Sequence, residues 1–122
     1  MPNKSTKTND IRFVESILFA LLLVNGIYSK ESAVELTKAI DVNPSVGKYY
    51  VSRSRVKYLT EDIRGAQEDI IAAILINPLE EGCIDVLPRL FPDATLTQVL
   101  HSSLTRQMKE QLLKRNVRLA IA

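Results

Sequence analysis

Residues 43–78 decide the fold, and they read NPSVGKYYVSRSRVKYLTEDIRGAQEDIIAAILINP. Asn43-Pro44 is a typical helix start, because asparagine caps the first turn and proline fits the first helical position. Asn77-Pro78 marks an end, since proline cannot continue a helix. In between, apolar or small residues recur at spacings of four and three: Ser52, Val56, Leu59, Ile63, Ala66, Ile70, Ala73 and Asn77. This rhythm predicts α-helix.

Two features leave the extent of these helices open. The unbroken rhythm favours one long helix over 44–76, whereas Thr60-Glu61-Asp62 is itself a good cap and favours two helices with a break near Thr60. Residues 49–59 also alternate basic with apolar or small side chains, which is typical of a strand. Helix is favoured over strand for this segment.

Further helices are predicted on both sides of this stretch. Their ranges are 11–25, 30–40, 79–87 and a long C-terminal helix over 95–119 that starts with the capping box Thr95-Leu96-Thr97-Gln98. Residues 1–9 are polar and read as a flexible arm. The sequence therefore predicts an all-α fold, with residues 10–122 forming a single domain of five or six helices and no internal repeat.

The composition places the chain among ordinary globular proteins, with 122 residues of which 46% are hydrophobic. The apolar run Ile17–Val24 is far shorter than the ~20 residues that span a bilayer. We expect a buried helix there, neither a membrane span nor a secretory signal. A single cysteine, Cys83, cannot form an internal disulfide, so a cytoplasmic location is expected.

Charge is distributed unevenly along the chain, although the net charge of +2 is too small to name a partner. Residues 44–59 contain four cations and no acid, whereas residues 60–93 contain eight acids against two cations. Cations on a common surface contact phosphates, and aromatic rings beside them can stack on bases. The candidate nucleic-acid-binding residues are Lys48, Tyr49, Arg53, Arg55 and Lys57. Alternatively, these cations pair with the acids of residues 60–93.

The order of the predicted elements adds to this hypothesis. Two helices, a short turn at residues 41–43 and a basic helix resemble the trihelical unit of helix-turn-helix proteins, in which the helix after the turn enters the major groove of DNA. Apolar residues stand at the positions that this motif requires: Leu36, Ile40, Val42 and Tyr50. The chain departs from the motif at Thr37, Asp41 and Gly47. If residues 51–59 were extended, they would instead resemble the wing of winged-helix proteins.

The residue inventory argues against catalysis. His101 and Cys83 are the only residues of their types, and the four glycines are too scattered for a phosphate-binding loop. Acids occur as adjacent pairs, which point about 100° apart on a helix and do not converge on one metal or proton. We therefore expect a protein that is not an enzyme and has no metal, cofactor or small-molecule substrate.

Apolar helix faces predict association. Phe19 and Leu23 make the second half of the first predicted helix apolar nearly all round. An apolar stripe also runs along one face of the last predicted helix and consists of Leu100, Leu104, Met108 and Leu112. These faces predict a homodimer interface, with packing in the chain's own core as the alternative. Two functions follow as hypotheses: a DNA-binding regulator that acts as a dimer, or a helical adaptor, chaperone or inhibitor that binds another protein.

Overall fold

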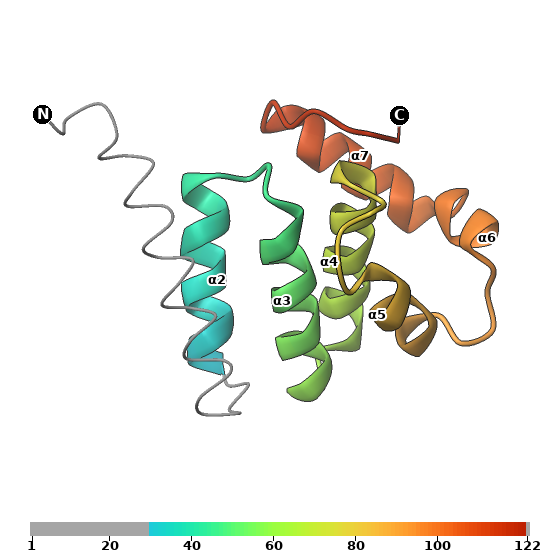
Figure 1. Ribbon diagram of the computed structural model, residues 1–122, viewed down its shortest axis with the longest axis horizontal. Helices are drawn as coiled ribbons and strands as arrows, with labels where there is room; N and C mark the ends of the chain where they lie inside the picture. Colours follow the sequence, from blue (N-terminus) through green and yellow to red (C-terminus); the bar gives the residue numbers. More distant parts are fainter. Residues whose placement is uncertain (1–29, 122) are drawn as a thin grey trace, which may run out of the picture.

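The computed structural model describes residues 30–121, and every regular element in this range is an α-helix (Figure 1). The helices are α2 (Lys30–Val42), α3 (Gly47–Leu59), α4 (Ile63–Ile76), α5 (Cys83–Leu90), α6 (Leu96–Leu100) and α7 (Ser103–Lys114). The predicted all-α fold is confirmed, and residues 49–59 are helix rather than strand. The predicted arm at residues 1–9 and the helix at 11–25 lie outside the described residues.

The central helix is α4. Helices α2, α3 and α4 lie side by side and run in alternating directions, while α5 packs on α4 and α3, and α7 packs on α4 (Figure 1). The second half of helix α4, residues 70–76, is apolar all round, and Ile70, Ile71 and Leu75 are buried. In helix-turn-helix proteins the two helices cross at about 90–120°. Helices α2 and α3 instead lie antiparallel along each other (Figure 1), which differs from that arrangement, and the first helix of the predicted trihelical unit lies outside the described residues.

The segment 44–76 forms two helices, because the chain turns sharply after Leu59. Glu61 has a φ of 67°, which no continuous helix permits. Asp62 then caps α4, and its carboxylate accepts a hydrogen bond from the Gly65 N–H at 2.9 Å. The acid-rich cap at residues 60–62 was therefore the correct signal, and the unbroken apolar rhythm was not.

The predicted long helix at 95–119 is wrong, because two shorter helices occupy this region. The capping box of Thr95 and Gln98 is present at the start of α6. The break follows at His101, where the hydroxyl groups of Ser102 and Thr105 both donate to the Val99 carbonyl at 2.6 Å. These side-chain hydrogen bonds compete with the helical backbone pattern and start α7 afresh.

Helix α5 begins four residues later than predicted and includes Pro88. Gly82 stands directly before it with a φ of 94°, a left-handed conformation that favours glycine. Beyond α7, the chain folds back over the end of α4, where the Ala120 N–H donates to the Leu75 carbonyl at 2.7 Å. No helix within residues 30–121 is both long enough and apolar enough to cross a membrane.

Helices α2 and α4 end in the same way, at well-separated points of the chain. Asn43-Pro44 follows α2 and Asn77-Pro78 follows α4. In both turns the asparagine N–H donates to a helix carbonyl four residues earlier, at 2.9 and 2.8 Å. Both asparagine side chains then accept a hydrogen bond from the backbone N–H two residues later, at 3.2 and 3.0 Å. The two turns are therefore local copies of each other.

The buried faces of the two helices repeat at the same spacing as the two turns. Leu36 in α2 and Ile70 in α4 are both fully buried, and Ala39 and Ala73 are both buried one turn further on. A second helix follows each turn, α3 after the first and α5 after the other. The expectation of no internal repeat is therefore wrong, because residues 30–90 contain a helical arrangement that occurs twice, first around Asn43 and again around Asn77.

Candidate functional site

The five predicted nucleic-acid-binding residues do not share one surface. Tyr49 is 1% exposed and belongs to the core. Arg53 and Lys57 lie toward α4, where both contact Asp69. Lys48 and Arg55 are exposed on the side of α3 that faces the start of α5.

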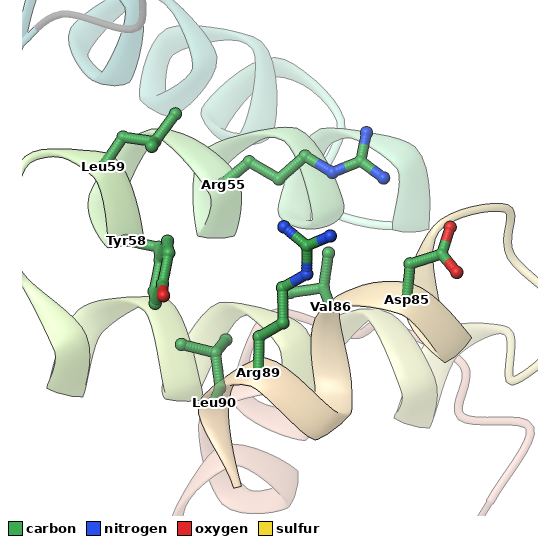
Figure 2. Close-up of a pocket in the computed structure, with 7 residues that line it drawn as sticks. All are labelled: Arg55, Tyr58, Leu59, Asp85, Val86, Arg89 and Leu90. Carbon is green, nitrogen blue, oxygen red and sulfur yellow. The ribbon is translucent and has the colours of Figure 1, made fainter. Parts of the chain in front are cut away.

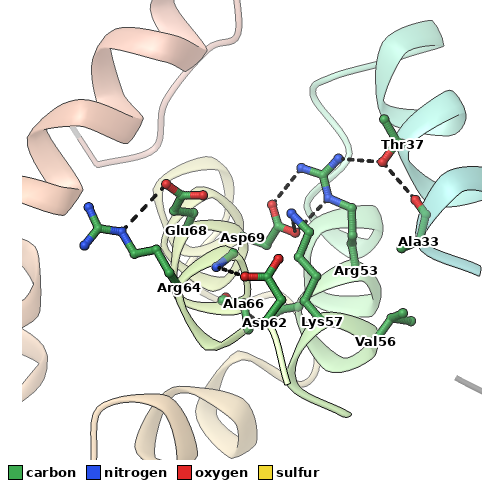
Figure 3. A network of polar contacts seen from close by, with 12 residues as sticks. Ala33, Thr37, Arg53, Val56, Lys57, Asp62, Arg64, Ala66, Glu68 and Asp69 are labelled. Carbon is green, nitrogen blue, oxygen red and sulfur yellow. Dashed lines mark hydrogen bonds and ion pairs between the residues drawn. The ribbon is translucent and has the colours of Figure 1, made fainter. Parts of the chain in front are cut away.

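Asp69 is the centre of a polar network that joins three helices (Figure 3). Its carboxylate is 1% exposed and accepts two hydrogen bonds from the Arg53 guanidinium, both at 2.7 Å. The Lys57 Nζ lies 3.1 Å from the same carboxylate. Burial by itself lowers the pKa of Arg53, but its hydrogen bonds to Asp69 outweigh this effect and raise the pKa above its ordinary value. Arg53 also donates to the Thr37 hydroxyl at 3.1 Å, which extends the network to α2.

This network bears on the two alternatives left open by the sequence. Pairing with the acids of residues 60–93 is found for Arg53 and Lys57, because Asp69 lies in that segment. A carboxylate that binds two of the four cations inside the fold turns them away from any phosphate-binding surface. The coherent positive face expected after Pro44 is therefore not present in the described structure.

Four of the residues predicted to form a dimer interface pack within the chain itself. Leu104, Met108 and Leu112 are buried in the core of the chain itself, and Leu100 packs against that core. Apolar side chains already removed from water gain nothing further from contact with a second subunit. The structure gives these residues a core role in place of the interface, whereas Phe19 and Leu23 lie outside the described residues.

A groove of about 320 Å³ separates the C-terminal half of α3 from α5 (Figure 2). Its lining residues are Arg55, Tyr58, Leu59, Asp85, Val86, Arg89 and Leu90. Arg55 extends from α3, and Arg89 rises from α5 toward α3, so two guanidinium groups face the same space (Figure 2). Leu59 and Tyr58 supply exposed apolar surface beside them. The groove therefore combines positive charge with an apolar wall.

A second hollow of about 330 Å³ adjoins the first and shares Arg55 and Asp85 with it. Its wall includes Glu80 and Glu81 together with Gly82. The left-handed backbone at Gly82 leaves no room for a side chain, since a Cβ there would lie 2.9 Å from the Arg55 Nη2 and from a Val51 methyl carbon. The missing side chain allows the Arg55 guanidinium to lie over the start of α5. The two hollows adjoin along α3: Arg89 lines only the first, Lys48, Glu80 and Glu81 line only the second, and Arg55 and Asp85 line both.

Sequence reasoning found Arg55 and missed the rest of this groove. Arg89 carried the clearest signal, because it is one of only two cations among eight acids in residues 60–93. Val86 and Leu90 stand four residues apart, the spacing of one helix face. Nothing in the sequence alone indicated that this short helix packs opposite Arg55.

Comparison with curated proteins gives a partial match. The chain is similar to tetratricopeptide repeat protein 16 of Macaca fascicularis and of Homo sapiens, each 30% identical over 74 residues, and of Mus musculus, 30% identical over 76 residues. These matches cover 61%, 61% and 62% of this chain but only 8%, 8% and 10% of the three relatives. The chain thus spans a tenth or less of the length of the curated relatives it matches. No family model and no solved structure matches the chain.

The repeat in that name consists of two helices joined by a turn, and it recurs with a period of about 34 residues. Pro78 stands one such period after Pro44. The repeat's pattern includes A-x₃-F in the second helix and a later proline. Ala66, Ile70 and Pro78 match this order, with isoleucine in place of phenylalanine.

The first helix of that repeat carries the pattern W-x₂-L-G-x₂-Y. In α3, Ser54 is completely buried and its hydroxyl donates to the Ala66 carbonyl of α4 at 2.8 Å. We therefore align Ser54 with the glycine of the pattern, the small residue that lets two helices approach closely. Counted from Ser54, Tyr50 occupies the tryptophan position, and Arg53 and Lys57 occupy the leucine and tyrosine positions. The chain therefore departs from the pattern at the two residues that bind Asp69.

Proposed function

We propose that this chain is a non-enzymatic helical-repeat module that binds a segment of another protein. The observation that carries the proposal is the double occurrence of a helix, an Asn-Pro turn and a second helix, first at Asn43 and again at Asn77. Repeats of this kind stack side by side, and the stacking leaves extended surfaces on which partners bind. The groove between α3 and α5 is a surface of that kind, because it lies between the helices that follow the two equivalent turns.

The similarity to tetratricopeptide repeat proteins supports the same proposal, since it falls on a protein named for its repeat. It favours the protein-binding hypothesis over the DNA-binding regulator. The Asp69 network also weighs against DNA binding, because Arg53 and Lys57 are already bound to a buried carboxylate. Self-association through the last helix loses its basis for a similar reason, since its leucine stripe is in the core.

The two most reactive side chains of the described region support a non-enzymatic role. Burial raises the pKa of the Cys83 thiol to about 11, so the nucleophilic thiolate is scarce at neutral pH. The His101 ring has its Nδ1 2.8 Å from the Thr97 carbonyl of the preceding helical turn. Neither side chain is activated as catalysis would require.

A comparison of two ligand classes tests the proposal. The full chain is used to select from a displayed library of random peptides, and the selected peptides are synthesised and titrated by fluorescence anisotropy. We expect saturable binding with micromolar Kd. The same chain is titrated with a duplex DNA at about 50 and 200 mM salt. Duplex binding that is tighter than peptide binding and falls steeply with salt would overturn the proposal in favour of the regulator.

A further inference from the structure

The groove between α3 and α5 holds two arginines that the described residues leave unpaired. Within residues 30–121, the guanidinium groups of Arg55 and Arg89 make no hydrogen bond and no ion pair, whereas Arg53, two residues from Arg55 and on the opposite side of α3, binds Asp69 and Thr37. Both arginines are exposed and line the same cavity. A planar guanidinium binds a carboxylate through two parallel hydrogen bonds. Two of them facing one space suit an anionic group that enters between α3 and α5.

The apolar part of the groove narrows the class of ligand. Leu59 is 55% exposed and Tyr58 40% exposed at its rim, whereas Val86 and Leu90 below them are already buried. An apolar side chain from a partner would cover Leu59 and Tyr58 and remove them from water. The groove thus matches a ligand in which a carboxylate and an apolar side chain lie close together, as in a peptide.

The acids at the other end of the groove set the polarity of the ligand. Glu80 and Glu81 line the adjoining hollow together with Lys48, and Asp85 lines both hollows. A nucleic-acid backbone carries negative charge along its whole length and would be repelled there. A peptide can instead place a basic residue beside Glu80 and Glu81 and an acidic residue beside Arg55 and Arg89.

We propose that this groove binds an extended segment of a partner protein in which an acidic residue and a neighbouring apolar residue are followed or preceded by a basic one. The carboxylate binds Arg55 and Arg89, the apolar side chain packs on Leu59, and the basic side chain faces Glu80 and Glu81. This inference rests on the proposed function, and it adds the chemistry and the place of the peptide site.

Synthetic peptides of defined composition test the site in the full chain. The probe is a fluorescein-labelled peptide that contains Leu and Asp as neighbours and a Lys several residues away, in a Gly/Ser background. Its matched control carries Asn in place of Asp. We expect the Asp peptide to bind about tenfold more tightly than the Asn peptide, as one charge-assisted pair provides. Binding should also perturb the NMR signals of Tyr58 and of the arginine side-chain N–H groups.

Variants of the protein place the binding in the groove. R55Q and R89Q are each expected to weaken binding of the Asp peptide about tenfold and to leave binding of the Asn peptide unchanged. R106Q is the matched control, because Arg106 is exposed on α7 and the substitution removes the same charge. Circular dichroism confirms that each variant is folded. Equal losses in R106Q would show general electrostatic attraction and would overturn the site.

The outcomes separate this inference from the proposed function. If library-selected peptides bind but neither R55Q nor R89Q weakens them, the groove site is wrong and the protein-binding module stands. If no peptide binds at all, both proposals fail. If R55Q and R89Q weaken binding of duplex DNA more than binding of the Asp peptide, the groove is part of a nucleic-acid-binding surface and the peptide site is wrong.

Discussion

The Asp69 network predicts that one isosteric substitution destabilises the whole domain. Asp69→Asn keeps the volume of the side chain but removes the charge that binds Arg53 and Lys57. Removing one partner of a fully buried ion pair costs about 3–5 kcal/mol. The side chains of Arg53 and Lys57 are 16% and 23% exposed, so they regain part of their hydration, and we expect the lower end, about 3 kcal/mol.

Urea unfolding followed by far-UV circular dichroism measures this loss. With an m-value of about 1.5–2 kcal/mol/M, the midpoint should fall by about 1.5–2 M. Glu68→Gln is the control, because the Arg64–Glu68 pair is exposed and its atoms lie 3.8 Å apart. Exposed pairs contribute about 0–1 kcal/mol, so this variant should unfold near the wild-type midpoint. The reasoning is refuted if Asp69→Asn and Glu68→Gln unfold at the same urea concentration.

A compensated variant sharpens the test. Arg53→Leu and Lys57→Tyr, combined with Asp69→Ala, introduce residues that the tetratricopeptide pattern has at the first two positions and leave no unpaired charge. Buried ion pairs replaced by apolar residues are often neutral or stabilising. The triple variant should therefore recover most of the stability that Asp69→Asn loses. A triple variant less stable than Asp69→Asn would show that packing around Asp69, and not its charge, supports the fold.

Three other predictions concern stability. Gly82→Ala should lower the free energy of unfolding by about 1–2 kcal/mol because of the positive φ, and Gly82→Asn should lower it less. The reverse order in urea unfolding would contradict the left-handed turn. Ile70→Ala should lower the free energy of unfolding by about 2–5 kcal/mol, because Ile70 is fully buried. Leu79 is 89% exposed, so Leu79→Ala should change it by no more than about 0.5 kcal/mol. Equal losses in the two variants would contradict the packing. Burial raises the pKa of the Cys83 thiol from 9.0 in the unfolded chain to about 11 in the folded one. The stability that this shift contributes is complete below pH 9 and is lost as the pH rises toward 11, because the unfolded chain then loses its proton first. The urea midpoint should therefore fall less over this pH range in Cys83→Ala than in the wild type; an identical fall would assign the effect to other groups.

Local signals in the sequence located most helices, because they depend on a few neighbouring residues. The cap at Asp62 and the capping box at Thr95 both start helices where the sequence indicated. The break at His101 escaped notice, since leucines at spacing four fit a continuous helix equally well. Only the hydroxyl groups of Ser102 and Thr105, which could also have pointed to solvent, end α6 there.

The repeat was visible in the sequence, because the Asn-Pro pair occurs twice, at Asn43 and at Asn77. Few other residues are identical between the two copies, so sequence identity gives only a weak signal of the repeat. Leu36 and Ile70 are equivalent in burial and not in identity, so the similarity is one of physical environment. A search for equivalent burial patterns at fixed periods would have found it.

Which cations of α3 are available to a ligand depends on the two neighbours of this helix. Arg53 and Lys57 are four residues apart and share the face toward α4, where Asp69 is buried. Arg55 lies two residues from each, about 200° around the helix, and thus faces α5 instead. The sequence alone shows four similar cations, because the acid that separates them is 16 residues from Arg53 and comes from another helix. The same packing that neutralises one face of α3 leaves Arg55 beside Arg89, and that contrast is the physical basis for a peptide site on the other face.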